Sequence, residues 1–295
     1  MPCAGRSAAP GMPMQQHQGP LAWLMLDERA RYQMCNQNRQ SYSNGDQMKI
    51  IKTLVVAATV LGSGAAFAAD DCAGLPTQSQ LSAALTAAVG KNGGLDFPMW
   101  GTVVNRYGRV CAVAKTGDAW PGSRVISAQK ANTATAFSNS NLALSTANLF
   151  SAVQPGGSLY GLQESNPVNP LVAYRGVDST TYGTASDPMN GLKVGGINIF
   201  GGGLALYAQA DGKTVLGGLG VSGDTSCADH NIAWKLRAAL GFTKVPGGVN
   251  SGSGAPSKGD DNIIFDITNG VSASGFGHSK GCPGSPSVPP SNVTN

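Results

Sequence analysis

The chain has 295 residues, which is enough for one large domain or two small ones. Charged residues make up only 12% of it, about half the share of an average soluble domain, and aromatic residues make up 6%. This composition excludes a coiled coil, a collagen and a wholly disordered chain. It also disfavours a surface of stacked aromatic rings that would bind single-stranded nucleic acid.

Residues 48–68 have the pattern of a secretory signal peptide. Lys49 and Lys52 supply a basic start, residues 54–61 form an apolar segment, and Ala66-Phe67-Ala68 is an A-x-A cleavage site. The segment is too short and too rich in small residues for a membrane span. We therefore expect an exported protein, periplasmic or extracellular, without a stable membrane anchor.

A signal peptide begins its chain, yet 47 residues precede Met48. We interpret residues 1–47 as a leader that results from a misassigned upstream start, the alternative being an unusually long basic region. The 68 residues that would be removed hold six of the 20 basic and three of the 16 acidic residues. The remainder is nearly neutral, so we expect no nucleic-acid partner.

Four cysteines remain after this processing: Cys72, Cys111, Cys227 and Cys282. An even number in an exported chain favours two disulfides, and three connectivities are open to four cysteines. We expect sequential pairing, Cys72 with Cys111 and Cys227 with Cys282. The sequence has no C-x-x-C spacing, so a thioredoxin-type motif or a zinc site of that type is poorly supported.

The first predicted helix begins at a capping box, Thr77 to Gln80, and continues with Leu81 and Leu85 at helical spacing until Gly90. Two apolar, β-branched runs follow and predict a β-hairpin. A second helix, rich in small residues, is predicted to pack closely on a sheet. The ranges of the hairpin strands and of this helix are 100–105, 110–114 and 122–137.

The second half of the chain predicts a long loop at 139–190, three strands at 194–200, 204–207 and 215–221, and a last helix at 226–240. A polar, Gly-rich C-terminal extension at 243–282 and a Pro/Ser-rich disordered tail at 283–295 end the chain. This order predicts an α+β fold, an antiparallel β-sheet flanked by helices, and it does not match the βαβ order of a dinucleotide-binding fold.

Three stretches resemble the GlcG/HbpS-like haem-binding family: SAQKANTATAFS at 127–138, VGGINIFGGGLALY at 194–207 and LGGLGVSGDTSCADHNIAW at 216–234. The resemblance covers roughly residues 75–242, within an expected domain at 69–242. It implies an α/β/α sandwich, assembly into a homo-oligomer, and binding of haem or a related tetrapyrrole. It also implies that the helix with Lys130 and Thr133 borders the ligand site. The alternative is that Lys130 is solvated and Thr133 packs into the sheet.

Only two histidines, His230 and His278, remain in the expected mature chain. Histidine is a common axial ligand of haem iron, so both are candidate ligands for haem or iron. The alternatives are a capping or surface histidine for His230 and a solvated loop histidine for His278. Asp224 and Asp229 bracket the last helix and are candidate metal ligands, or else capping residues that complement the helix dipole.

A Cys227–Cys282 bridge would confine both histidines to one neighbourhood, because His230 follows Cys227 by three residues and His278 precedes Cys282 by four. The function we favour is an exported haem-binding protein that sequesters or senses haem. The alternative is an enzyme or accessory factor in oxidative tetrapyrrole turnover or in support of a periplasmic oxidoreductase. A mature chain with one glutamate, Glu164, does not favour a paired-glutamate acid–base catalyst.

Overall fold

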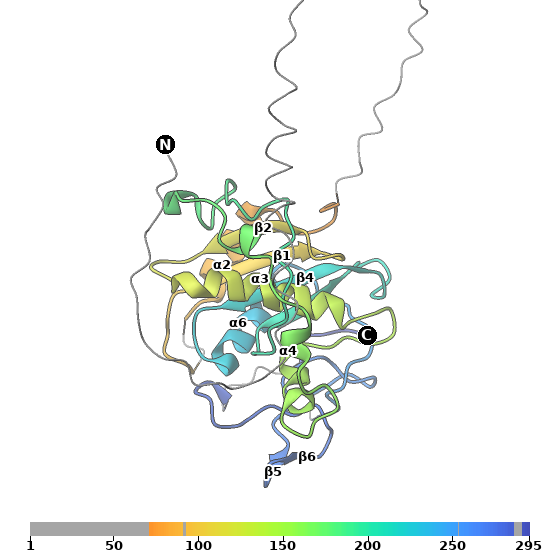
Figure 1. The fold of residues 1–295 in the computed structure, drawn as a ribbon. Helices are drawn as coiled ribbons and strands as arrows, with labels where there is room; N and C mark the ends of the chain where they lie inside the picture. The colour runs from red at the N-terminus through yellow and green to blue at the C-terminus, as the bar shows by residue number, and fades with distance from the viewer. Residues whose placement is uncertain (1–70, 91–92, 253, 286–290) are drawn as a thin grey trace, which may run out of the picture. The chain divides into compact units, whose positions relative to one another are not determined.

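The computed structural model describes residues 71–90, 93–252, 254–285 and 291–295 (Figure 1). The expected leader and signal peptide lie outside these residues. The centre of the fold is a four-stranded antiparallel sheet in the order β2-β1-β4-β3. Its strands are β1 (Trp100–Asn105), β2 (Val110–Lys115), β3 (Gly203–Tyr207) and β4 (Val215–Ser222).

Helices cover both faces of the sheet. Helix α3 (Pro121–Ala136) packs on one face, and helices α2 (Gln78–Ala88) and α6 (Ser226–Ala239) pack on the other. Because side chains alternate along a strand, Val103 belongs to the core under α2 and α6, whereas Val104 belongs to the core under α3. The predicted α+β sandwich is therefore confirmed, as are both hairpin strands.

The α2 start is built as its sequence predicts. The Thr77 side chain accepts a hydrogen bond from the Gln80 backbone N–H, and the Gln80 side chain accepts one from the Thr77 N–H. This capping box satisfies two of the N–H groups that a helix start leaves without partners. Leu81 and Leu85 then turn into the core.

Helix α3 lies directly on the backbone of β4, at two glycines. A Cβ atom on Gly220 would collide with the carbonyl oxygen of Ser127, and one on Gly218 with that of Ala131. Any residue other than glycine at either position would push the helix away from the sheet. The small residues of α3 and the glycines of β4 are thus two halves of one close contact.

Residues 194–200, predicted as a strand, do not join the sheet, so that prediction was wrong. Gly195 and Gly196 both have positive φ, 69° and 77°, which breaks an extended run. The segment instead lies along α3, where Asn132 donates to the Gly196 carbonyl and the Thr133 hydroxyl accepts from the Asn198 N–H.

The 139–190 region is a long loop with short helical turns. A buried ion pair between Arg124 of α3 and Asp187 joins this region to the helix. The turns are η1 (Thr146–Leu149), η2 (Ser151–Val153), α4 (Leu162–Ser165), α5 (Pro170–Ala173) and η3 (Ser179–Thr181).

The C-terminal extension carries a small hairpin, β5 (Ile267–Thr268) with β6 (Val271–Ser272), and is anchored on α6. Arg237 makes two hydrogen bonds of 2.6 and 2.7 Å to the Asp261 carboxylate, and both side chains are buried. Val293 also joins the core, so the expectation of a disordered tail is wrong for residues 291–295. These residues are held by the burial of the Val293 side chain and by a backbone hydrogen bond from the Thr294 N–H to the Thr243 carbonyl.

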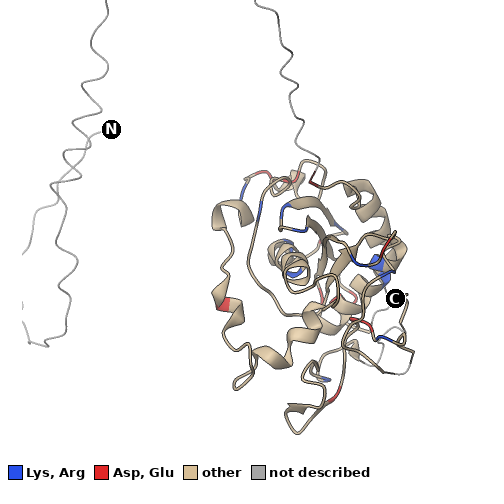
Figure 2. Ribbon diagram, turned by 90° about the vertical axis from the view of Figure 1, so that its right-hand side faces the viewer, with Lys and Arg blue, Asp and Glu red and all other residues tan. Residues whose placement is uncertain are grey.

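Charged residues are few and spread over the described ribbon, without a continuous band of either sign in the view of Figure 2. Among the helices of the described ranges, none has the length and apolar character needed to cross a bilayer.

We predict that Gly220→Ala lowers the free energy of unfolding by about 1–3 kcal/mol, the usual range for overpacking, because the new methyl group meets backbone rather than a movable side chain. Urea denaturation followed by circular dichroism measures this. Gly122→Ala in the first turn of α3, where an added Cβ meets nothing within 4 Å, is the matched control and should be neutral or stabilising. Equal stability of the two variants would contradict the prediction.

Candidate functional site

The N-terminal end of α6 gathers most of the polar residues that the sequence singles out. Thr225 caps the helix, and its hydroxyl accepts from the Ala228 N–H. The Asp224 carboxylate accepts from the N–H groups of Leu95, Phe97 and Thr225. Asp224 therefore holds the segment before β1 against the start of α6, and its oxygens are used within the fold.

Lys130 and Asp229 form a buried ion pair across the end of β4. Lys130 Nζ lies 2.6 Å from Asp229 Oδ2 and 2.9 Å from the Val221 carbonyl oxygen. Asp229 Oδ1 accepts from the Asp224 N–H. Burial raises the pKa of Asp229 to about 6 and lowers the pKa of Lys130, while their mutual attraction opposes both shifts. The pair thus joins α3 to α6 and is closed to solvent.

Thr133, one turn beyond Lys130 on α3, is also used within the fold. Its hydroxyl donates to the Gln129 carbonyl and accepts from the Asn198 N–H. It positions the 194–200 segment, and its side chain is buried.

His230 is enclosed, with 0% of its surface exposed. Its Nε2 lies 2.9 Å from Asn262 Oδ1 and 3.1 Å from the Ile263 nitrogen, both in the C-terminal extension. Its Nδ1 has no hydrogen-bond partner. Burial lowers the pKa of His230 to about 4, so the ring is neutral at pH 7.

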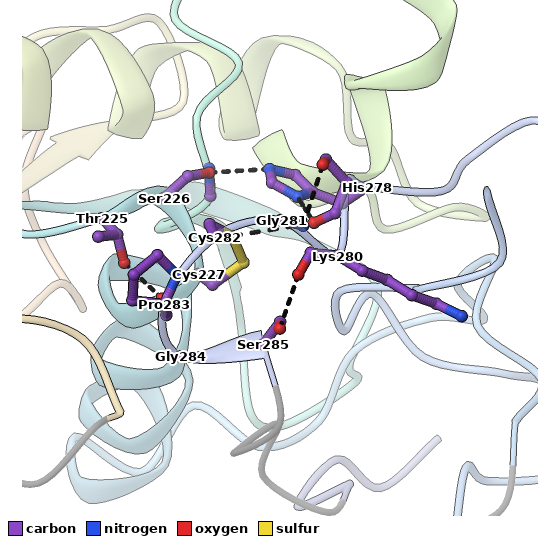
Figure 3. The surroundings of a disulfide bond; sticks show 12 residues. Thr225, Ser226, Cys227, His278, Lys280, Gly281, Cys282, Pro283, Gly284 and Ser285 are labelled. Carbon is purple, nitrogen blue, oxygen red and sulfur yellow. Dashed lines mark hydrogen bonds between the residues drawn. A yellow bond between two sulfur atoms is a disulfide. The ribbon is translucent and has the colours of Figure 1, made fainter. Parts of the chain in front are cut away.

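His278 lies between two aromatic rings, with Phe150 4.6 Å and Phe265 6.3 Å away between ring centroids. Its Nδ1 is 3.0 Å from the Ser279 carbonyl oxygen, and its Nε2 is 2.8 Å from Ser226 Oγ (Figure 3). A carbonyl only accepts hydrogen bonds, so Nδ1 carries the proton and Nε2 accepts from the Ser226 hydroxyl. Burial also lowers the pKa of His278.

A disulfide joins the start of α6 to the end of the extension beside His278. Cys227 and Cys282 are bonded with their Cα atoms 5.9 Å apart, and Cys72 and Cys111 are bonded with their Cα atoms 5.7 Å apart. Sequential pairing is therefore what the structure has. The bond and the contact between Ser226 and His278 bring His278 to the N-terminal end of the helix that carries His230.

A cleft of about 580 Å³ lies next to His278, between the η2 region and the β5–β6 hairpin. Phe150, Ile267 and Val271 give it apolar walls, and its other lining residues are small or uncharged. Ser279 lies at its edge, and the neighbouring Lys280 is exposed. Sequence reasoning missed this cleft because it forms between segments about 120 residues apart, neither of which has a recognisable motif.

We predict that replacing His230 flattens the acid limb of the stability curve. The folded-state pKa of about 4 lies below the unfolded value of 6.5. The contribution of His230 to the free energy of unfolding is therefore complete above pH 6.5 and is lost progressively as the pH falls toward 4, because protonation then favours the unfolded chain. The loss amounts to about 3 kcal/mol. His230→Gln, which retains a donor for Asn262, should lack this loss in urea denaturation from pH 7.5 to 4. Parallel stability curves for the two proteins would refute the prediction.

We predict strong coupling between Lys130 and Asp229. Asp229→Asn leaves a buried ammonium group without its counter-charge and should cost about 3–5 kcal/mol. Adding Lys130→Met removes that charge and should restore at least about 2 kcal/mol, because an apolar replacement of a buried pair is much better tolerated than half of it. A double-mutant cycle from urea denaturation measures the coupling. Additive effects of the two changes would show that the pair does not act as a unit.

Comparisons with known proteins give the family of this chain. A family model described as haem degrading protein HbpS-like matches residues 77–237. A comparison with curated proteins gives no match.

Three solved structures are similar to this chain. Klebsiella pneumoniae protein ORFY has 27% identity and a TM-score of 0.40, covering 56% of this chain and 90% of that chain. PduOC, solved in complex with haem, has 25% identity and a TM-score of 0.40, covering 57% and 94%. A double mutant of Streptomyces reticuli HbpS has 18% identity and a TM-score of 0.32, covering 55% and 83%. The family match itself spans more than half of the sequence, and on that ground this chain belongs to the HbpS-like family.

Proposed function

We propose that this protein is an exported haem-binding protein that sequesters or senses haem or a related tetrapyrrole. The observation that carries the proposal is its membership of the HbpS-like family over residues 77–237, which include both main-sheet hairpins and α6 up to Arg237. The signal-peptide pattern at 48–68 supports export, and two disulfides are compatible with an oxidising compartment.

The histidines do not fit direct ligation of haem iron in this arrangement. His230 is enclosed, and His278 is 3% exposed with both ring nitrogens hydrogen-bonded. Lys130, Thr133, Asp224 and Asp229 are likewise engaged in bonds within the fold. We therefore assign none of these candidates as an axial ligand.

The cleft beside His278 suits the macrocycle rather than the iron. Its volume of about 580 Å³ lies within the usual range of small-molecule pockets, and Phe150, Ile267 and Val271 give it apolar walls among uncharged residues. Phe150 offers an aromatic ring to a flat ligand. In this proposal the ligand is held mainly by apolar contact with the ring system.

A second candidate function is oxidative haem turnover, which the description of the family favours. Bound haem supplies a redox-active iron in that case. The chain would then retain the ligand only until the macrocycle is cleaved, so the two functions differ in whether the visible spectrum of the complex persists.

Self-association is part of the proposal. Three large apolar side chains of the 139–190 loop, Leu171, Tyr174 and Val177, are each more than two-thirds exposed. Exposed apolar residues of this kind often contact other protein chains. They are the first positions at which we expect a second copy of the chain to bind.

We predict that hemin and iron-free protoporphyrin IX bind with affinities within about tenfold of each other, because the macrocycle supplies the contact. Phe150→Ala should weaken both by about 1–3 kcal/mol, the range for losing an aromatic contact and its buried area. Absorbance titration for hemin and fluorescence titration for protoporphyrin measure this. Tyr107→Ala, which removes an exposed aromatic ring in the turn between β1 and β2, is the matched control and should bind as the parent does.

Two outcomes would count against this binding mode. Binding of hemin without protoporphyrin would indicate iron ligation, and unchanged affinity in Phe150→Ala would place the ligand elsewhere. A Soret band that persists with reductant and oxygen supports sequestration or sensing, whereas reductant-dependent bleaching supports turnover.

A further inference from the structure

One set of potential metal ligands in the described ranges is separate from the haem proposal. Ligand atoms of Cys227, Cys282 and His278 all lie within 4.8 Å of one another. Cys227 and His278 are buried, and Cys282 is partly exposed. Figure 3 shows the imidazole above the sulfur atoms, between the start of α6 and the loop that ends at Cys282. Two sulfurs and one imidazole are a common zinc donor set.

The two disulfides of the protein differ in their surroundings. Cys227 is the second residue of α6, where backbone N–H groups and the helix dipole stabilise a thiolate. Cys282 is reachable by an attacking thiolate, and Cys227 would then be the stabilised leaving group. The Cys72–Cys111 bond starts no helix and has no such neighbouring histidine within the described chain.

We propose that, when the Cys227–Cys282 bond is reduced, the two thiolates and His278 Nε2 bind a thiophilic divalent cation such as Zn²⁺. A dithiol reductant supplies two electrons and two protons, the S–S bond breaks, two cysteine thiols form, and the reductant becomes a disulfide. Binding of the cation then releases both thiol protons. A water molecule completes a four-coordinate site on the partly exposed side of Cys282.

The geometry of the fold already suits this site. With Zn–S bonds of about 2.3 Å and a Zn–N bond of about 2.0 Å, neighbouring ligand atoms in a tetrahedral site lie roughly 3.5 Å apart. Once the S–S bond is broken, side-chain movement separates the two sulfurs to about this distance and brings the more distant ligand atoms, now up to 4.8 Å apart, closer together, with the cysteine Cα atoms at their present 5.9 Å. The Nδ1–H group of His278 donates a hydrogen bond to the Ser279 carbonyl. Metal-bound histidines usually have an orienting hydrogen bond of this kind at the nitrogen that does not bind the metal. Only the hydrogen bond from Ser226 has to be exchanged for the cation.

The site would hold the same two segments with or without the disulfide. The Thr225 hydroxyl also donates a hydrogen bond to the carbonyl of Pro283, the residue after Cys282. This contact keeps Cys282 near α6 once the disulfide is broken. A cation would replace the covalent link by a coordinated one, with the extension retained on the domain.

Co²⁺, a spectroscopic substitute for Zn²⁺, tests this on the full chain carrying Cys3→Ser and Cys35→Ser, so that only the four paired cysteines remain. After reduction by a phosphine, Co²⁺ should give a thiolate-to-cobalt charge-transfer band and the visible bands of a tetrahedral ion. His278→Ala should weaken Co²⁺ binding at least about tenfold. The oxidised protein should show neither band.

Matched double variants separate the two cysteine pairs. Adding Cys227→Ser with Cys282→Ser should abolish the bands, whereas adding Cys72→Ser with Cys111→Ser should leave them. X-ray absorption of the reduced, Zn²⁺-loaded parent should give two sulfur and at least one nitrogen neighbour, and this measurement does not depend on the folding of any further variant. Bands that survive loss of Cys227 and Cys282, or free thiols without bands in the parent, would overturn the proposal.

Discussion

The contact between α3 and the glycines of β4 sets the positions of the other polar groups. Because Gly218 and Gly220 have no side chains, the helix lies on the strand backbone itself. At that distance the Lys130 side chain reaches the Val221 carbonyl near the end of β4 and Asp229 of α6. A helix a few ångströms further out would leave the ammonium group buried without its counter-charge, which is a costly arrangement.

From this pair the order extends outward through hydrogen bonds. Asp229 accepts from the Asp224 backbone, and the Asp224 side chain fixes the segment that leads into β1. The residues with the most obvious chemistry are thereby used to join the three layers. Polar groups that are fully hydrogen-bonded in a dry interior have little capacity left for a ligand, and this is why function is better sought at the cleft and the sulfur atoms than at the carboxylates.

Much of the framework could be predicted from sequence because local chemistry determines it. The capping box at Thr77, the hairpin and the start of α6 need only neighbouring residues to form. The paired glycines at 195 and 196 override the apolar pattern that predicts a strand there, and Val293 is held by a partner far away in the sequence. Asp224, Asp229, His230 and His278 lie around the start of α6, but burial, which decides whether these side chains are free to bind a ligand, depends on an extension whose packing has no local signature.

The Arg237–Asp261 ion pair bears on where the folding unit of this protein ends. The family match stops at residue 237, yet that arginine is neutralised by an aspartate 24 residues beyond it, in the extension. A chain cut at the family boundary would keep a guanidinium group inside the protein with its partner carboxylate deleted. The extension is therefore an integral part of the folded domain here, because it supplies the counter-charge of a buried helix residue.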